Sequence, residues 1–297
     1  MKLNDAHVHF FSAGFFRALS GLDSPTVDPA IALPEKLGWD PPGDDAHLAD
    51  QWVSVLDRHH VSRAMLIASA PGDEVSVAVA RARHPSRIVG AFMVNPLAPD
   101  AATRISRGFG ECGLSTACLF PAMHRVPVDS AATEVVFEAA RRAGGAVFVH
   151  CGVLSIGVRA KLGLPSPFDL RLGDPLAVAA VAVRYPTVPV IIPHFGAGLF
   201  REALMAVGAA PNILLDTSSS NSWIRLHHNL TLRDVFARAL DVAGAARLLF
   251  GTDSSFFPRG WQHRIHEEQQ AVLTELGVDA DGQAAIFGGN FDRVYQV

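Results

Sequence analysis

The sequence predicts an α/β fold, a (β/α)8 TIM barrel that residues 1–297 form as one domain, with a long insertion after the first strand. Two observations favour this fold. Eight short runs that are apolar on both faces alternate with segments of helical periodicity, as in an all-parallel sheet. A chain of 297 residues is long for an ordinary domain and usual for such a barrel. A doubly wound open sheet is the alternative.

Each predicted strand is a short apolar run, and most of these runs end at a proline, a glycine or a polar residue. Because parallel strands are buried on both faces, we expect no alternation of polar and apolar residues within them. The first strand lies within residues 1–10, and the other seven cover residues 64–68, 88–94, 114–120, 146–150, 188–193, 213–216 and 247–251.

The predicted helices show the spacing of an amphipathic helix together with start and stop signals. Residues 174–184 begin with Asp174 as a cap and Pro175 in the first turn, and residues 74–83 end at His84-Pro85. The other predicted helices cover residues 46–60, 100–108, 130–143, 199–207, 231–242 and 262–276, and a last one lies within 281–297.

Residues 11–45 are rich in proline, glycine and aromatic residues, and we expect a lid or insertion loop there. The segment leaves the first strand at its carboxyl end, so it should lie at the mouth of the barrel. Two further long loops are predicted at residues 152–173 and 218–229, after the fifth and seventh strands. Both should face the same mouth.

Polar residues suited to metal binding stand at the carboxyl ends of four predicted strands. His7 and His9 are two residues apart, so on a strand they point to the same face. His150, His194 and Asp253 end the fifth, sixth and eighth strands. In a barrel these ends meet at one mouth, where catalytic residues collect, so the five side chains should be neighbours.

This constellation resembles the metal-dependent amidohydrolase superfamily, and within it the amidohydrolase-2 group. That group includes aminocarboxymuconate semialdehyde decarboxylase and related hydrolases. The resemblance is carried by Asp5-Ala6-His7-Val8-His9, the strand-ending His150 and His194, and Phe250-Gly251-Thr252-Asp253-Ser254. The segment Ile286-Phe287-Gly288-Gly289-Asn290-Phe291 also looks like the end of family members.

The resemblance implies that His7, His9, His150 and Asp253 bind one divalent metal ion, with zinc expected and manganese as the alternative. It implies that His194 is the catalytic acid or base, with Asp253 also acting in catalysis by orienting a water molecule. Neutral imidazoles and a carboxylate suit zinc independently of the resemblance.

A single metal ion is expected because binuclear relatives bridge two ions with a carboxylated lysine on strand four. The chain has three lysines, Lys2, Lys36 and Lys161, and none lies on that strand. No glutamate replaces it there. Cys118 on this strand is a potential ligand, but a buried core thiol is the simpler interpretation.

Three functions fit these residues. The first is a metal-dependent hydrolase that uses metal-activated water on a small, carboxylate-bearing substrate. The alternative is a metal-dependent, non-oxidative decarboxylase of an unsaturated or aromatic acid. The third is a metal-free binding barrel in which the histidines are core residues.

An anionic substrate requires cationic partners, and with so few lysines we sought these among arginines on the mouth-side loops. An aromatic wall for the substrate is expected as well. The substrate-binding candidates are Arg17, Arg125, Trp223, Arg225 and Arg259.

The composition limits the partners. A net charge of −4 without a basic run does not indicate nucleic-acid binding, and no run of eighteen apolar residues predicts a membrane span. Three cysteines without CxxC spacing indicate reduced thiols. Together with an N-terminus unlike a signal peptide, they predict a cytoplasmic protein. The partner is then a small-molecule substrate. Homodimers are common in the family that the chain resembles, and the sequence does not show one.

Overall fold

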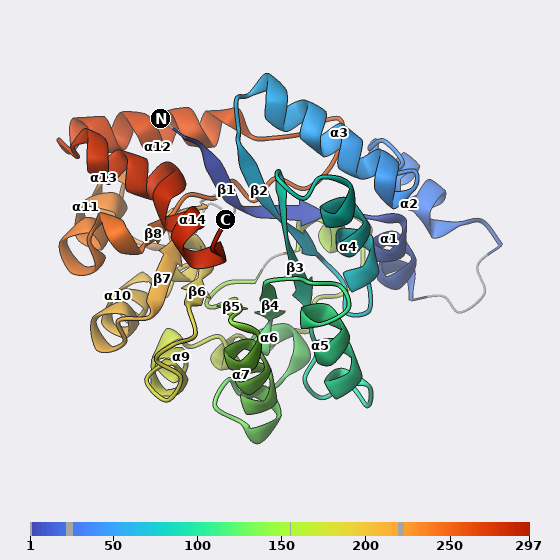
Figure 1. Cartoon of the computed structure of the whole chain (residues 1–297), viewed down its shortest axis with the longest axis horizontal. Coiled ribbons are helices and arrows are strands. Elements are labelled where there is room, and N and C mark those ends of the chain that lie inside the picture. The colour runs from blue at the N-terminus through green and yellow to red at the C-terminus, as the bar shows by residue number, and fades with distance from the viewer. Residues whose placement is uncertain (1, 22–25, 155, 219–222) are drawn as a thin grey trace.

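A computed structural model describes residues 2–21, 26–154, 156–218 and 223–297. It contains one sheet of eight parallel strands in the order β1 to β8, with helices between them (Figure 1). This confirms the barrel and excludes the doubly wound sheet. The strands are β1 (Asn4–Phe10), β2 (Arg63–Ala68), β3 (Ile88–Met93), β4 (Thr116–Leu119), β5 (Ala146–Val149), β6 (Val190–Ile192), β7 (Ile213–Asp216) and β8 (Leu248–Leu249).

The observed strands are mostly shorter than the predicted ones, because apolar residues at their ends, such as Val94, Leu114 and Phe120, lie outside the strands. β8 is the shortest, and the barrel closes through the residues that follow it. Ala6 N donates to Phe250 O (2.8 Å), His9 N donates to Ser254 O (2.7 Å), and Asp253 N donates to the backbone oxygen of His7 (2.9 Å). The segment after β8 therefore continues beside β1 and brings Asp253 next to the two histidines.

The outer helices lie close to their predicted bounds, and α4 coincides with its prediction. These helices are α3 (Asp45–Arg58), α4 (Glu74–Arg83), α5 (Ala101–Phe109), α7 (Ala131–Ala143), α9 (Pro175–Ala182), α10 (Phe200–Ala209), α11 (Leu232–Ala243) and α12 (His263–Glu275). Their apolar faces pack on the outside of the barrel, in the main hydrophobic cluster, where Trp52 and Phe236 are fully buried.

The segment expected to be a loop, residues 11–45, holds two helices in its described part, α1 (Ala13–Ser20) and α2 (Pro29–Leu37). The loop prediction is wrong for these residues; that the segment acts as a lid or is an insertion stays a prediction. Ser12 caps α1, and Asp28 caps α2 with Pro29 in the first turn. The high proline content indicated a loop, but Pro29 is tolerated at a helix start.

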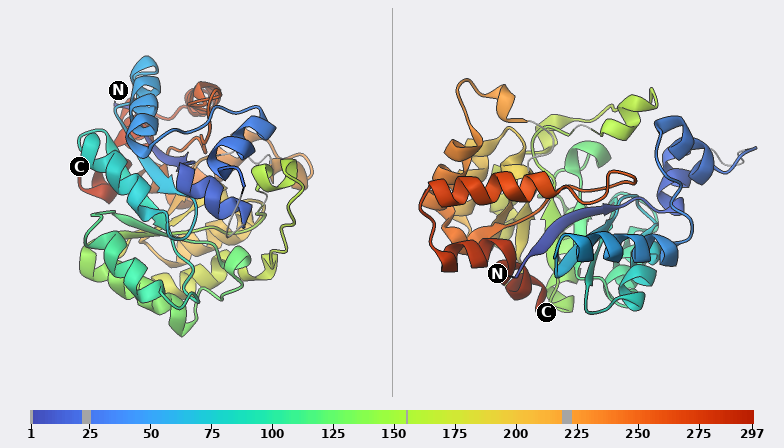
Figure 2. Two further views of the ribbon diagram at one scale, coloured as in Figure 1. Left: turned by 90° about the vertical axis from the view of Figure 1, so that its right-hand side faces the viewer. Right: turned by 90° about the horizontal axis from the view of Figure 1, so that it is seen from above.

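A separate apolar cluster joins this segment to the loop after β5. Phe15, Phe16 and Trp39 pack with Val158 of α8 (Gly157–Lys161). Figure 2 shows α1, α2 and α8 together at one end of the barrel. The first and fifth βα connections therefore meet over the barrel mouth.

The opposite end of the barrel is closed by the C-terminal segment. It forms α13 (Ala280–Ala284), a π-turn (Ala285–Gly289) and α14 (Asn290–Tyr295) in place of the single predicted helix. Phe291, Val294 and Tyr295 of α14 pack into the barrel interior, where Cys118 of β4 is also fully buried. The burial of Cys118 agrees with its interpretation as a core thiol.

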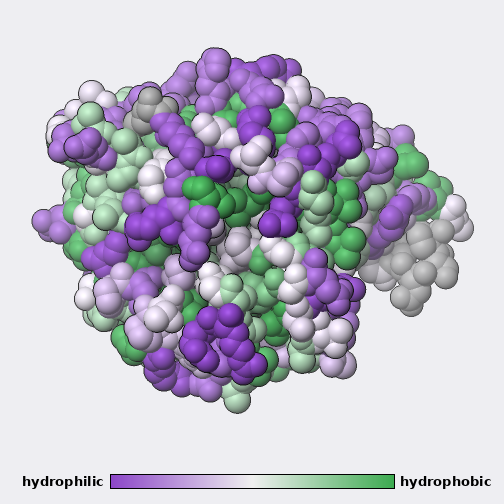
Figure 3. Space-filling model, in the orientation of Figure 1, coloured by the Kyte–Doolittle hydropathy of each residue, from purple (hydrophilic) through white to green (hydrophobic). Residues whose placement is uncertain are grey.

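On the face drawn in Figure 3, hydrophilic residues cover most of the helices and hydrophobic residues form smaller groups between them. Within the described residues, no helix combines the length and hydropathy needed to cross a membrane.

The β1–β8 contact is reinforced by the buried carboxylate of Asp5. Its Oδ2 accepts hydrogen bonds from Thr252 Oγ1 (2.5 Å) and Trp261 Nε1 (2.7 Å), and its Oδ1 accepts from the backbone nitrogens of His7 (2.9 Å) and Thr252 (3.2 Å). Burial outweighs these bonds and raises the pKa of Asp5 to about 6. The carboxylate thus ties β1 to the segment that carries Asp253.

We expect Thr252→Val to destabilise the protein by about 1–3 kcal/mol, because it removes a donor from a buried carboxylate. Chemical denaturation measures this free energy of unfolding. Thr274→Val is the matched control, because Thr274 is exposed on α12 and donates only to a helix carbonyl. Equal effects of the two substitutions would contradict the role assigned to Asp5.

A second carboxylate with a raised pKa links α1 to α4. Asp73 accepts hydrogen bonds from Ser12 Oγ (2.6 Å) and Ser76 Oγ (2.9 Å). It lies so close to Gly14 that a Cβ there would be 2.2 Å from Asp73 Oδ1. Burial, only partly offset by the two serine hydroxyls, raises the pKa of Asp73 to about 6 from its ordinary value of 3.8.

Because the folded state holds this proton more tightly than the unfolded state, Asp73 should stabilise the fold below about pH 4. That contribution should disappear as the pH rises to about 6. The free energy of unfolding of Asp73→Asn minus that of wild type should therefore increase by about 1–2 kcal/mol from pH 4 to pH 7. Denaturant titrations of both proteins across this range measure the change. A pH-independent difference would contradict the raised pKa.

Candidate metal centre and active site

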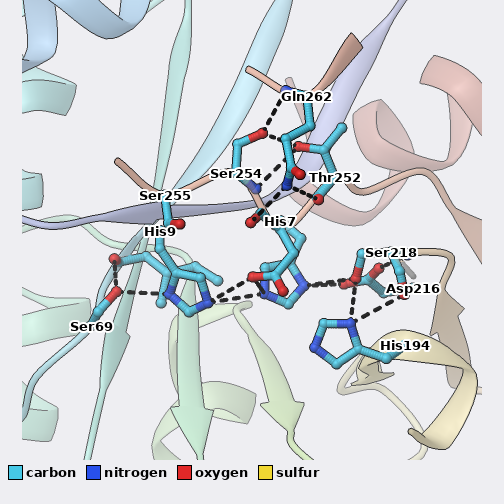
Figure 4. A network of polar contacts seen from close by, with 12 residues as sticks. His7, His9, Ser69, His194, Asp216, Ser218, Thr252, Ser254, Ser255 and Gln262 are labelled. Carbon is cyan, nitrogen blue, oxygen red and sulfur yellow. Dashed lines mark hydrogen bonds and ion pairs between the residues drawn. The ribbon is translucent and has the colours of Figure 1, made fainter. Parts of the chain in front are cut away.

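His7, His9 and Asp253 form a compact group at the mouth of the barrel. Their nearest ligand atoms all lie within 4.8 Å of one another. Figure 4 shows the two histidine rings of this group beside each other. His7 Nε2 and His9 Nε2 are 3.4 Å apart, and Asp253 Oδ1 lies 3.6 Å from the former and 3.2 Å from the latter. Three of the four predicted ligands are thus brought together.

Two neighbouring polar side chains orient the histidine rings. His7 Nδ1 contacts Asp216 Oδ2 at 2.5 Å, and His9 Nδ1 contacts Ser69 Oγ at 2.8 Å. Asp216 ends β7 and Ser69 follows β2. Both rings therefore turn Nε2 towards Asp253, which leaves these nitrogens available for a metal ion.

The spacing and chemistry of this donor set fit a divalent ion. Tetrahedral zinc with bonds of about 2.0–2.1 Å separates its ligand atoms by about 3.3 Å, close to the observed 3.2–3.6 Å. Two imidazoles and one carboxylate form a common catalytic zinc set, and the same atoms suit manganese.

Electrostatics favour the same assignment. Burial alone lowers the pKa of His7, but the Asp216 charge and hydrogen bond outweigh it and raise the pKa to about 9. Burial alone raises the pKa of Asp253, but its hydrogen bond with His9 and the charge on His7 hold the pKa well below its usual range. Asp253 is therefore ionised, and the Asp216 carboxylate makes His7 a basic imidazole that must release its Nε2 proton to bind a metal ion.

His194 lies beside the group, with its ring centroid 4.9 Å from that of His7. Its Nδ1 contacts Ser218 Oγ at 2.7 Å and donates to the backbone oxygen of Ser218 at 3.2 Å. Because a carbonyl oxygen only accepts, the ring proton sits on Nδ1 and Nε2 keeps its lone pair. Burial lowers the pKa of His194, so its ring is neutral near pH 7.

The backbone that carries His194 is strained. The five residues from His194 to Gly198 all have positive φ, including His194 (56°), Phe195 (52°) and Ala197 (43°). Such conformations in residues other than glycine cost about 1–3 kcal/mol each and cluster at functional sites. The fully buried Phe195, packed on Phe200 and Phe236, anchors this turn.

His150 lies after β5 and lines the same cavity, but it does not belong to the three-residue group. Its ring stacks on Phe120 at 5.3 Å and lies 5.4 Å from the ring of His194. Its buried Nδ1 has no hydrogen-bond partner among the described residues. Burial holds the pKa of His150 well below its usual value, so the ring is neutral.

The residues that orient the candidate ligands were not predicted from the sequence. Asp216 and Ser218 lie at the end of β7, and Ser69 follows β2. Asp216 could have been found by the strand-end rule that identified the other site residues, since it is the last residue of a predicted strand. Ser69 carries no comparable signal. Of the polar stretch after β7, residues 219–222 lie outside the described residues.

A cavity of about 430 Å³ opens above these side chains. Its inner end is polar, and its walls are mostly aromatic and aliphatic. The lining residues are His7, His9, Phe11, Phe15, Trp39, Ser69, Met93, Phe120, Met123, His150, Leu154, Ile156, Gly157, Val158, Lys161, His194, Asp253, Ser255, Phe256 and Arg259.

Of the predicted substrate-binding residues, Arg259 lines this cavity and the other four do not. Arg17 pairs with Asp28 (2.7 Å), and Arg125 donates to the backbone oxygen of Pro167 (2.9 Å). Trp223 is buried against Phe200, and the neighbouring Arg225 is exposed. Lys161 of α8 was overlooked as a cation because only arginines were considered.

Comparisons with known proteins agree with this architecture. A family model described as amidohydrolase matches residues 5–297. A manganese-bound 5-carboxyvanillate decarboxylase from Novosphingobium aromaticivorans is 14% identical, with a TM-score of 0.64 over 100% of this chain and 97% of that one. No protein of curated function matches the sequence.

Two further solved structures are similar over 100% of both chains. One is a probable 2-pyrone-4,6-dicarboxylic acid hydrolase from Acinetobacter baumannii with citric acid bound, at 14% identity and a TM-score of 0.63. The other is a zinc-bound amidohydrolase from Burkholderia multivorans, at 17% identity and a TM-score of 0.67. At these identities the structures support the fold alone.

A substitution at Gly251 tests whether Asp216 orients the ring of His7. A Cβ at this position would lie 2.8 Å from Asp216 Oδ1 and 2.9 Å from His7 Cβ. We expect Gly251→Ala to push the pair apart and weaken metal binding about 10–100-fold. Chelator competition measures the affinity. Gly208→Ala in α10 is the control, because a Cβ there meets nothing within 4 Å. Unchanged affinity in Gly251→Ala would show that the pair does not control the site.

Proposed function

The chain belongs to the amidohydrolase family, and from this premise we propose that it is a metal-dependent hydrolase of a small, carboxylate-bearing substrate. Membership makes it an enzyme of the amidohydrolase superfamily and sets aside the metal-free binding barrel. The observation that carries the proposal is the group of His7, His9 and Asp253 at the inner end of the cavity.

The proposed ligands are His7, His9 and Asp253, with His150 completing the set as predicted. The partnerless, buried Nδ1 of His150 supports its inclusion. Zinc is the proposed ion and manganese the alternative. A divalent ion bound by these residues would polarise the carbonyl group of the substrate and lower the pKa of a bound water molecule.

His194 is the proposed proton carrier. Its neutral ring and the free lone pair on Nε2 allow it to accept a proton at neutral pH and return it to the leaving group. Ser218 fixes the ring through Nδ1 and keeps Nε2 available. Asp253, which is ionised, has a second role in orienting the attacking water. The apolar walls exclude bulk water from the reaction.

Non-oxidative decarboxylation is the second candidate, and the apolar cavity walls favour it. A substrate carboxylate moved from water into such surroundings is destabilised relative to neutral carbon dioxide. In this reaction the carbon atom that loses the carboxylate must receive a proton, and His194 would first take this proton up from solvent on Nε2 and then pass it to the carbon. Hydrolysis is preferred because it needs only a carbonyl group beside the bound ion.

Metal content tests the proposed centre. We expect about one equivalent of zinc or manganese in protein purified without chelator, and a loss of most of it in His9→Ala. His47→Ala is the control, because His47 is exposed on α3. Elemental analysis that finds no metal in wild type, or equal metal in all three proteins, would overturn the proposal.

The product then separates the two reactions. The metal-loaded enzyme is screened against small esters, lactones and amides and against unsaturated and aromatic acids, in ¹⁸O-labelled water. Hydrolysis transfers one labelled oxygen to the product. Release of carbon dioxide, without labelled oxygen in the remaining product, would replace hydrolysis by decarboxylation.

A further inference from the structure

Two cationic side chains line the cavity on its mouth side, Lys161 of α8 and Arg259 of the segment after β8. In the described part of the chain neither forms an ion pair with a carboxylate. This distinguishes them from surface arginines such as Arg17 and Arg171, which pair with Asp28 and Asp169. Both residues are exposed to solvent as well as lining the cavity, so a ligand entering it meets them.

Aromatic rings hold both cations in place. Lys161 Nζ lies 5.6 Å from the ring of Trp39 and 5.9 Å from that of Phe256, and the Arg259 guanidinium carbon lies 4.4 Å from the Phe256 ring. Trp39 and Phe256 stack on each other at 3.9 Å. One aromatic pair therefore positions both cations.

These contacts leave hydrogen-bond donors for a ligand. A cation over a ring face is attracted to it without using its N–H groups, so the three donors of Lys161 remain available. Arg259 uses Nη2 to contact Ser255 Oγ at 2.8 Å and the backbone oxygen of Asp253 at 3.4 Å. Its Nε and Nη1 have no such bonds among the described residues.

The charges in the cavity are unbalanced. Among the described residues that line it, Asp253 is the only one with a carboxylate, and that side chain belongs to the proposed metal centre. A substrate with one carboxylate near the centre would leave Lys161 and Arg259 without a counter-charge. A second anionic group at the mouth side of the substrate provides a counter-charge for both residues.

We propose that the substrate is a dicarboxylate, with one end at the metal centre and its second carboxylate held by Lys161 and Arg259 beside the Trp39–Phe256 pair. This rests on the proposed function and names the substrate class of the same site. The mostly apolar walls between the two ends suit an unsaturated or aromatic body.

The test uses benzoate, benzene-1,3-dicarboxylate and benzene-1,4-dicarboxylate as probes, with binding to the zinc-loaded full chain measured by titration calorimetry. The variants are Lys161→Met, which keeps an apolar stem, and Arg259→Gln. The matched controls are Lys36→Met on α2 and Arg201→Gln on α10, exposed residues that do not line the cavity.

In wild type, the better dicarboxylate should bind about tenfold more tightly than benzoate at low salt. Each variant should lose about tenfold in dicarboxylate affinity and keep its benzoate affinity within about twofold. The dicarboxylate preference should shrink as salt is added. The control variants should behave as wild type.

Equal affinity for benzoate and both dicarboxylates would overturn the proposal. Variants that lower the affinity for all three probes equally would also overturn it, since Lys161 would then only hold α8 against Trp39 and would not select a carboxylate. The measured zinc content distinguishes a failure of the dicarboxylate proposal from a failure of the proposed metal centre. If wild type binds no zinc, the proposed function fails, and the same titrations on the metal-free protein still decide whether Lys161 and Arg259 select dicarboxylates.

Discussion

The whole site depends on how the barrel closes between β1 and β8. Backbone hydrogen bonds pair the segment after β8 with β1, and the buried carboxylate of Asp5 receives donors from both sides of this contact. The same contact fixes Asp253 beside His7 and His9, because Asp253 N donates to the backbone oxygen of His7. The contacts that close the barrel therefore also bring the residues of the candidate metal centre together.

Two turns of the candidate site have a strained backbone. Asp253 has a φ of 57°, and His194 begins a run of residues with positive φ. Conformations of this kind persist only where the surroundings over-determine them. Here the buried Phe195 holds one turn, and Thr252 and Trp261, bonded to Asp5, flank the other. The stability of the core thus maintains side-chain positions that the local backbone does not favour.

The barrel and the grouping of His7, His9 and Asp253 could be predicted because strand ends of a parallel barrel converge, whatever their sequence separation. The orienting contacts could not be predicted. Asp216 acts on one nitrogen of His7, and the direction of a ring depends on side-chain packing that periodicity does not contain. The helices α1 and α2 were missed because the segment that holds them is rich in proline and glycine, which suggested a loop. Lys161 was missed because cations were sought among the arginines alone.

The polar end and the apolar wall of the cavity come from different elements of the fold, and we infer different roles for them. The polar end comes from strand termini whose positions the barrel fixes. The apolar wall and the cations come from connections that pack on each other, where Phe15 and Trp39 meet Val158. A substitution in that cluster can reshape the wall without moving β1 or β8. We infer that the candidate metal centre determines which chemistry is possible, and that the contact between the first and fifth βα connections determines which molecule reaches it.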